Sequence, residues 1–378
     1  MSVLGSYRLF NKLDNGSLSG AQLETLLAGS RELAEFKQLC DTTQAASALA
    51  ASPTAVAAIG GSAIATQVVL DNRRNFDVVA RQRLSAASVT FLEQFFITET
   101  VATGYSGTIT NVFYNNGIFF LNQSDSSLVI TDGLGKNSTP PTLNTNIVAM
   151  AFGNETLVAF RNTGATAFYS RDGGVYWSTA TIPNASWVEV AFGNGVFVAL
   201  ANSTFITSPD GITWTTRTAP AGVWRSVVFG GGQFVAVGDN TAATSPDGIT
   251  WTIRTIPTTI PAGSWISVTH GNGLFVAVAA TTAAIATSPD GITWTSRTLP
   301  AGITSLYSVA FGGGLFVATH NGQAVYIVSK DGITWYRKAS ASAFPTYSRS
   351  IAYGNGLFLL NTTSTTGAVQ RSISATIP

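Results

Sequence analysis

The sequence contains very little cysteine, histidine and charge. Its 378 residues include 1 Cys, 2 His and only 10% charged residues, and the formal net charge is +1. The single cysteine, Cys40, excludes an intrachain disulfide and a cysteine-based zinc site. Near-neutral charge without a Lys/Arg cluster argues against nucleic-acid binding, which needs concentrated positive charge to neutralise phosphates. We therefore expect no metal, no cofactor and no nucleic-acid partner.

A long apolar run is missing too, although one segment carries no charge. Residues 42–70 contain no Asp, Glu, Lys or Arg, but they are rich in alanine and are interrupted by Ser, Pro, Gly and Gln. A membrane span needs about 20 mainly large apolar residues. The first 22 residues also lack the basic and then apolar segments of a secretion signal. The sequence therefore predicts no membrane insertion and no signal peptide.

The first 95 residues have the periodicity of helices. Apolar residues recur at helical spacing between residues 19 and 40, with a break at Gly29 and Ser30, and again between residues 73 and 94. We expect residues 1–95 to form an Ala-rich α-helical module that serves in docking or oligomerisation. Short helices with little core of their own usually need partners, and a homotrimer is one arrangement that meets this need.

From about residue 108 the chain repeats a unit of about 40 residues. The first element of the unit is an aromatic residue, a Gly/Asn turn and an apolar strand. Its clear copies begin at Phe152, Phe192, Phe229, His270, Phe311 and Tyr353, and a degenerate copy begins at Tyr114. The second element is a Ser-x-Asp-Gly turn followed by Trp. Its aspartates are Asp172, Asp210, Asp247, Asp290 and Asp331, and its tryptophans are Trp177, Trp214, Trp251, Trp294 and Trp335.

Each unit holds four short apolar segments separated by turn residues, which is the requirement for one blade of a β-propeller. In one unit we expect strands at 224–229, 234–237, 242–245 and 250–255. Seven copies of the first element predict a seven-bladed, mainly β propeller over residues 96–378. The last copy lacks a fourth strand, and residues 95–101 are placed to supply it, because an unpaired edge is a liability.

The aspartate of the repeated turn is best interpreted as structural. Gly permits a positive φ, Asp and Ser accept hydrogen bonds from the turn's own amides, and Trp packs between neighbouring blades. The five copies resemble the Asp-box, or BNR, repeat of sialidase-like propellers. That resemblance implies a scaffold role on the face away from any active site.

An enzyme of the sialidase type is not expected. Sialidases use an arginine triad, a Tyr–Glu pair and a mobile acid, and no arginine motif precedes the first turn here. Glu155 and Glu189 lie in different strands without a reason to meet, although glycoside hydrolysis needs two close carboxylates. Arg217, Arg254 and Arg297 recur at one repeat position, as on a solvated outer strand. We therefore assign no catalytic residue.

Ligands of propellers bind on the face opposite such turns, and this analogy of fold selects a set of candidates. The rings could either pack between blades or form platforms for sugar stacking. The candidate ligand-binding residues are Trp187, Trp224, Trp265, Tyr307 and Tyr347, together with Arg161, Asn202, Asp239, Asn240, His320 and Asn321 in nearby polar loops.

The N-terminal segments 51–58 and 61–65 resemble the Ala/Ser repeats near the N-termini of some tailed-phage tail and fibre proteins. With the propeller, this resemblance implies a structural virion protein of a tailed phage, assembled in the host cytoplasm. Residues 1–95 would bind other tail proteins, and the propeller would recognise a host-surface glycan. The alternatives are a non-viral bacterial glycan-binding or assembly-scaffold propeller and a degenerate glycosidase.

Overall fold

The computed structural model describes Ser19, residues 21–23, Phe36 and residues 97–373, with gaps in the last range at 103–108, 132–136, 139–142, 257–263, 321–324, 340–349 and 362–367 and at a few shorter points. The chain divides into two compact units. One consists of residues 1–97 with 373–378, and the other consists of residues 98–372.

In the first unit, a helix begins just after Ser19. The Gln22 amide donates to Ser19 Oγ at 3.3 Å, and the Ser19 amide donates to Gln22 Oε1 at 2.8 Å. This reciprocal pair is a capping box, which satisfies amides that the first helical turn leaves without partners. Residues 21–23 and Phe36 are helical, and the side chains of Leu23 and Phe36 are buried. The rest of the predicted helical module, including 42–70, lies outside the described residues.

The second unit consists of antiparallel strands that follow one another along the chain. The first sheet has the order β2 (Ile109–Asn115), β3 (Ile118–Gln123), β4 (Leu128–Thr131) and β5 (Asn137–Ser138). The next sheet contains β6 (Ile147–Gly153), β7 (Thr156–Arg161), β8 (Thr163–Ser170), β9 (Ser178–Gly193), β10 (Val196–Ala201), β11 (Phe205–Ser208) and β12 (Thr215–Arg217).

Three further four-stranded sheets have the same order. They consist of β13 (Trp224–Gly230), β14 (Gln233–Gly238), β15 (Thr241–Ser245) and β16 (Thr252–Thr255); of β17 (Trp265–Gly271), β18 (Leu274–Ala279), β19 (Ala284–Ser288) and β20 (Thr295–Arg297); and of β21 (Leu306–Gly312), β22 (Leu315–His320), β23 (Val325–Ser329) and β24 (Tyr336–Ala339). The strands predicted at 224–255 are thus confirmed as β13–β16.

The last sheet joins the two ends of the repeat region. It contains β25 (Ile351–Gly354), β26 (Leu357–Asn361) and β27 (Ala368–Ile373), and its fourth strand is β1 (Ile97–Ala102), which lies beside β27. The pairing expected for residues 95–101 is therefore present. The edge that β27 would otherwise expose is covered by a strand from the start of the repeat region.

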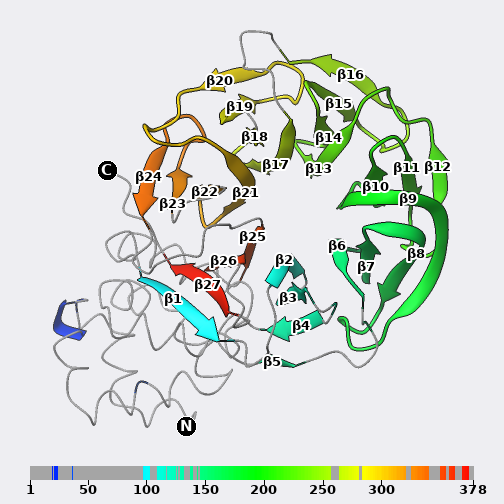
Figure 1. Ribbon diagram of the computed structural model, residues 1–378, viewed down its shortest axis with the longest axis horizontal. Coiled ribbons are helices and arrows are strands. Elements are labelled where there is room, and N and C mark those ends of the chain that lie inside the picture. The colour runs from blue at the N-terminus through cyan, green and yellow to red at the C-terminus, as the bar shows by residue number, and fades with distance from the viewer. Residues whose placement is uncertain are drawn as a thin grey trace, which may run out of the picture. The chain divides into compact units, whose positions relative to one another are not determined.

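Strand β9 explains why one sheet has seven strands. The first part of this 16-residue strand pairs with β8, up to Thr163 opposite Ser186, and its second part pairs with β10, from Trp187 opposite Ala201. One continuous strand is therefore the outermost strand of one four-stranded layer and the innermost strand of the next. Figure 1 shows the sheets of this unit around a common axis, with β2, β6, β13, β17 and β21 on the inside and β12, β16, β20 and β24 on the outside. This arrangement is a β-propeller and is mainly β, as predicted.

Neighbouring sheets meet through an aromatic ring placed on a glycine. A Cβ atom at Gly193 would lie 1.9 Å from Cγ of Phe229 in the next sheet, so only glycine fits there. The same relation joins the last sheet to the first, where a Cβ at Gly354 would lie 2.0 Å from the ring of Tyr114. Ser350 adds a second link, because its Oγ accepts from the Val112 amide at 3.1 Å. The ring of sheets is therefore closed by specific contacts between its two ends.

The Ser-x-Asp-Gly turns are held by their own side chains. At Asp210, Oδ1 accepts from the amides of Ile212 and Thr213 at 2.8 Å each, and Ser208 Oγ donates to the same oxygen at 2.9 Å. The Trp214 indole donates to the Gly211 carbonyl at 3.1 Å. Equivalent bonds recur at Asp172, Asp247, Asp290 and Asp331. These hydrogen bonds within each turn agree with a structural role for the aspartates.

We expect Asp210→Ala to lower the free energy of unfolding by about 1 kcal/mol, as the loss of a comparable helix cap does. Burial alone would raise the pKa of Asp210, but the amides of Thr213 and Ile212 outweigh it and hold that pKa below its usual value. The carboxylate therefore stabilises the fold above pH about 4, and this contribution is lost as the pH falls through the lower folded pKa. Urea unfolding at pH 7 and pH 3 measures both effects. An equal loss for the variant at both pH values would contradict them.

Candidate functional site

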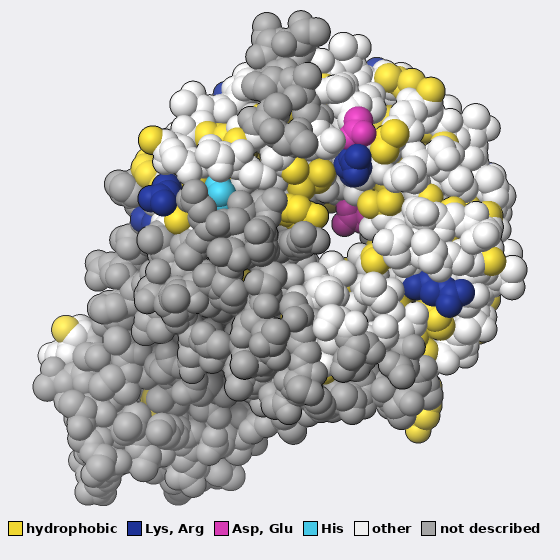
Figure 2. All heavy atoms as spheres, in the orientation of Figure 1, with side chains coloured by type: hydrophobic (Ala, Val, Ile, Leu, Met, Phe, Trp, Pro, Cys, Tyr) yellow, Lys and Arg dark blue, Asp and Glu magenta, His cyan; other side chains and the backbone are white. Residues whose placement is uncertain are grey.

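A cavity of about 650 Å³ lies on the axis of the propeller. Its wall comes from the innermost strands, namely β2, β6, β9, β13, β17, β21 and β25. Figure 2 shows the hollow on the face of the molecule, with acidic and basic side chains at its edge. We call this space the axial cavity.

The axial cavity reaches the face away from the Ser-x-Asp-Gly turns. The turn after β6 contacts the turn after β11, because Asn154 Nδ2 donates to the carbonyls of Gly195 and Pro209. The cavity wall instead includes Asn162 and Asn202, which follow β7 and β10 at the opposite strand ends. The face on which ligand binding was expected is therefore one that the cavity reaches.

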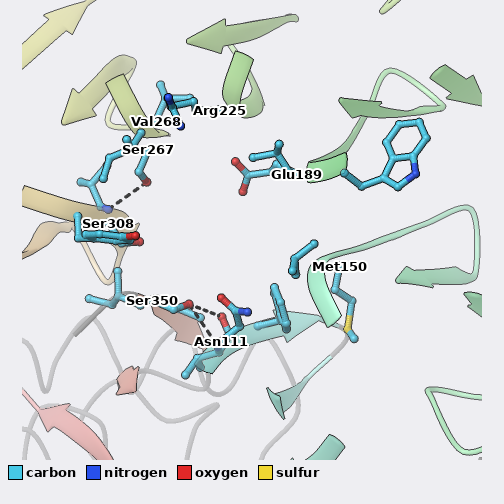
Figure 3. A pocket seen from close by; sticks show the side chains of 18 of the residues that line it. Asn111, Met150, Glu189, Arg225, Ser267, Val268, Ser308 and Ser350 are labelled. Atoms are coloured by element: carbon cyan, nitrogen blue, oxygen red, sulfur yellow. Dashed lines mark hydrogen bonds between the residues drawn. The ribbon is translucent and has the colours of Figure 1, made fainter. Parts of the chain in front are cut away.

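A repeated serine joins the innermost strands around the cavity. Ser226 Oγ accepts from the Val268 amide at 3.1 Å, and Ser267 Oγ accepts from the Val309 amide at 3.2 Å, as Ser350 does from Val112. Each serine stands three residues before the aromatic residue of its repeat. Figure 3 shows Ser267 and Ser350 on the cavity wall with these bonds. The position therefore has a structural role in three of the repeats.

Glu189 occupies this serine position on β9. Its Oε2 accepts from the Val227 amide at 3.2 Å, so the carboxylate keeps the link to the next sheet. Figure 3 shows the rest of the carboxyl group directed into the open centre of the cavity. Burial raises the pKa of the Glu189 carboxyl to about 7, although hydrogen bonds from Ser226 and Val227 act in the opposite direction. At this repeat position, the carboxyl group of Glu189 thus replaces the smaller serine hydroxyl and faces the cavity.

Arg225 and Asp239 form an ion pair beside Glu189. Arg225 Nε lies 2.8 Å from Asp239 Oδ1, and Nη2 lies 3.2 Å from Oδ2, so the contact is bidentate. The hydrogen bond from Arg225 lowers the pKa of Asp239, and the bond to Asp239 raises the pKa of Arg225. Because the pair neutralises itself, Glu189 is the acidic side chain on the described cavity wall that has no counter-charge.

The three predicted tryptophan platforms are buried, although Trp187 is among the residues that line the axial cavity. Trp187, Trp224 and Trp265 are at most 1% exposed. Trp224 packs against Phe205 with ring centroids 5.8 Å apart, and Trp187 packs against Phe160 at 5.4 Å. Sugar stacking needs an open ring face, so this part of the prediction is wrong and the packing alternative is correct. The tryptophans lie between sheets because β-sheets of a propeller bury their faces against one another.

The other candidates are placed differently from one another. Tyr307 and Asn202 line the cavity, and Asp239 reaches it through Arg225. Arg161 and Asn240 are not among its lining residues. His320 is buried, with Nε2 accepting from the Thr304 amide at 3.2 Å, so its assignment to a ligand-binding loop is wrong. Tyr347 and Asn321 lie outside the described residues.

Sequence reasoning missed Glu189 and Arg225 as members of one site. A signal was present, because aligned repeats carry serine where β9 carries Glu189. Such a departure from a structural repeat marks a residue that the scaffold does not require. In the described part of the chain, no cluster of three or more His, Cys, Asp or Glu side chains could hold a metal ion. No helix among these same residues is long and apolar enough to cross a membrane.

Comparison with known proteins supports the fold. The family described as "DUF6242 beta propeller domain" matches residues 222–356. No curated protein matches the sequence. Virginiamycin B lyase from Staphylococcus aureus is similar in structure, with a TM-score of 0.65, 12% identity, and coverage of 74% of this chain and 99% of that chain.

Two other similar structures belong to proteins of different kinds. YCF48 bound to a D1 peptide has a TM-score of 0.58 and 16% identity, and the match covers 73% of this chain and 97% of that chain. The Cps50 (Swd1) β-propeller domain of Myceliophteria thermophila has a TM-score of 0.57 and 13% identity, and the match covers 73% and 99%. At these identities the likeness shows the fold alone, which is that of a β-propeller domain.

Proposed function

We propose that this chain is a recognition protein, without catalytic activity, of a tailed-phage virion, and that its axial cavity binds a host-surface glycan. The observation that supports this proposal most directly is the cavity itself, where Glu189 replaces the repeated serine and lies with Arg225 among neutral Asn, Ser and Tyr side chains. Concave sites that combine apolar walls with a few convergent polar groups are typical of ligand binding. In place of the buried tryptophans, recognition uses these polar groups.

The virion assignment depends on the N-terminal Ala/Ser segments, which resemble those of phage tail and fibre proteins. In this proposal, residues 1–95 bind other virion proteins, and a trimer is the favoured assembly. The proposal includes seven blades with Asp-box turns, and the two pairing partners of β9, which allow the seven-stranded sheet to be divided there, support this number. YCF48, whose structure holds a bound peptide, is a propeller of similar fold that binds a partner.

An enzymatic role is the second candidate, because a cavity carboxyl with a pKa raised to about 7 is typical of proton donors. Among the described residues that line the cavity, however, Glu189 is the only acid. Glycoside hydrolysis needs a second carboxylate, and Asp239 is held by Arg225. Binding therefore agrees better with the geometry. Release of reducing ends from a bound polysaccharide, abolished by Glu189→Gln, would establish the enzyme instead.

The binding proposal is tested with bacterial surface polysaccharides on an array. Arg225→Ala should weaken binding by about 10-fold or more, because a charge-assisted contact is lost. The side chains of Arg225 and Asp239 are 38% and 35% exposed, so the free energy of unfolding should change by less than about 1 kcal/mol. Arg254→Ala is the matched control, since Arg254 lies on the outermost strand β16 and bonds Thr244 on β15. Equal binding by wild type and both variants would contradict the site.

The virion assignment has its own test. Antibodies against the propeller should label purified phage particles in electron micrographs and detect the chain in their protein content. Polysaccharide binding by a chain absent from every particle would favour the non-viral glycan-binding propeller.

A further inference from the structure

The charged residues on the cavity wall favour one sign of charge on a bound ligand. Its charged lining residues are Glu189 and Arg225, and Arg225 is already paired with Asp239. The remaining polar lining groups are neutral, and examples are Asn162, Asn202 and Tyr307. An anionic group bound at Arg225 would lie beside the Asp239 carboxylate and on the same wall as Glu189. A ligand with a positive group meets no like charge at Glu189.

Glu189 is placed to receive that positive group. Oε2 accepts from the Val227 amide, while the carboxyl group as a whole is directed into the cavity. A buried carboxylate is costly without a counter-charge, and a bound cation supplies one. Ser226, at the neighbouring serine-type position on β13, is uncharged; it accepts from the Val268 amide and also hydrogen-bonds Glu189. The other charged lining residue, Arg225, is paired with Asp239.

We propose that the axial cavity binds an amino sugar through its free ammonium group, with Glu189 as the acceptor of that group. The inference rests on the proposed glycan recognition and names the ligand class. Sugar hydroxyls both donate and accept hydrogen bonds, so they can bond the neutral Asn and Tyr side chains that line the cavity. The alkyl chain of a lysine in a peptide would leave these groups without ligand partners. N-acetylation removes the positive charge and is expected to abolish the preference.

The test uses the full chain and calorimetric titration with two probes, a glucosamine oligomer and the same oligomer fully N-acetylated. Wild type should bind the free-amine form about 10-fold or more tightly. Glu189→Gln keeps the size and the bond from Val227, and it should remove this difference. Glu155→Gln is the matched control, because Glu155 is an exposed acid outside the cavity lining. The melting temperature of each variant confirms that it is folded.

A second readout needs no variant. At pH 6 the Glu189 carboxyl, with a pKa near 7, is mostly protonated in the free protein. An ammonium group beside it favours the charged form, so binding should release about half a proton or more into solution. Titration in two buffers of different ionisation enthalpy measures this release. The other titratable side chains on the described wall are Tyr114, Arg225 and Tyr307, and none of them is a carboxyl or an imidazole.

The outcomes separate this inference from the proposed function. Equal binding of both oligomers, or binding without proton release, overturns the amino-sugar assignment. Binding of a lysine peptide in preference to the glucosamine oligomer overturns it as well. If wild type binds array polysaccharides but shows no preference for free amines, glycan recognition stands and only the ligand class is wrong. If it binds no polysaccharide, the proposed function itself fails.

Discussion

Replacing Trp224 with alanine should lower the free energy of unfolding by about 3–5 kcal/mol. The ring is 0% exposed and packs edge-on against Phe205 between two sheets. Its indole Nε1 donates to the Pro220 carbonyl at 3.0 Å, so the variant also leaves that carbonyl without its partner. Urea denaturation followed by intrinsic fluorescence and circular dichroism measures the loss. Glycan binding by the surviving folded fraction should be unchanged, because the ring does not reach a ligand.

The control for Trp224→Ala is Tyr176→Ala. Tyr176 is also a large aromatic residue, but its side chain is 66% exposed at a Ser-x-Asp-Gly turn. Its removal should change the free energy of unfolding by less than about 0.5 kcal/mol. A stable Trp224→Ala variant that has lost glycan binding would restore the stacking platform as the correct interpretation.

Gly193→Ala should destabilise the propeller by about 3 kcal/mol or more. The added methyl group would lie within 2.5 Å of three atoms of Phe229, a distance that no packed side chain tolerates. Phe229 is itself confined by Phe234, whose ring centroid is 4.9 Å away. The rings must therefore move, or the two sheets must separate. The midpoint of urea unfolding measures this cost.

Gly195→Ala is the matched control in the same turn. Gly195 has a φ of 78°, but no atom lies within 4 Å of a Cβ built there. The expected cost is therefore only the backbone term of about 1 kcal/mol. In a Phe229→Ala background, the penalty for Gly193→Ala should shrink, because the clash has been removed. An unchanged penalty in that background would show that contact with Phe229 is not its cause.

Much of the propeller was predictable because its repeats are local. The Ser-x-Asp-Gly turns and the strands between them are each specified by a few consecutive residues, and β13–β16 lie within a residue or two of the expected ranges. The pairing of β1 with β27 was predictable from the missing strand of the last repeat. The helical N-terminal module remains a prediction beyond residues 21–23 and Phe36.

The site was harder to predict because burial depends on neighbours that are distant in sequence. Trp224 and Tyr307 stand near equivalent repeat positions, yet Trp224 is enclosed by Phe205 from the preceding sheet while Tyr307 lines the cavity. Sequence spacing places both at the same end of a strand and cannot tell which ring the adjacent sheet covers. In the sequence, Glu189 was considered only as a carboxylate that lacks a second carboxylate for hydrolysis. The informative feature was instead that it replaces the repeated serine, whose link to the next sheet it keeps.

The pairing of β1 with β27 also affects synthesis of the protein. A strand that emerges early from the ribosome has its hydrogen-bonding partner among residues 368–373. Sheets β13–β16 and β17–β20 can form as their own residues emerge, but β1 must wait with an unpaired edge until translation has passed this point. Chaperone binding to nascent chains should therefore persist until that stage. A premature stop codon before residue 368 would remove β27, leaving β1 without its partner and β26 with an exposed edge in the last sheet.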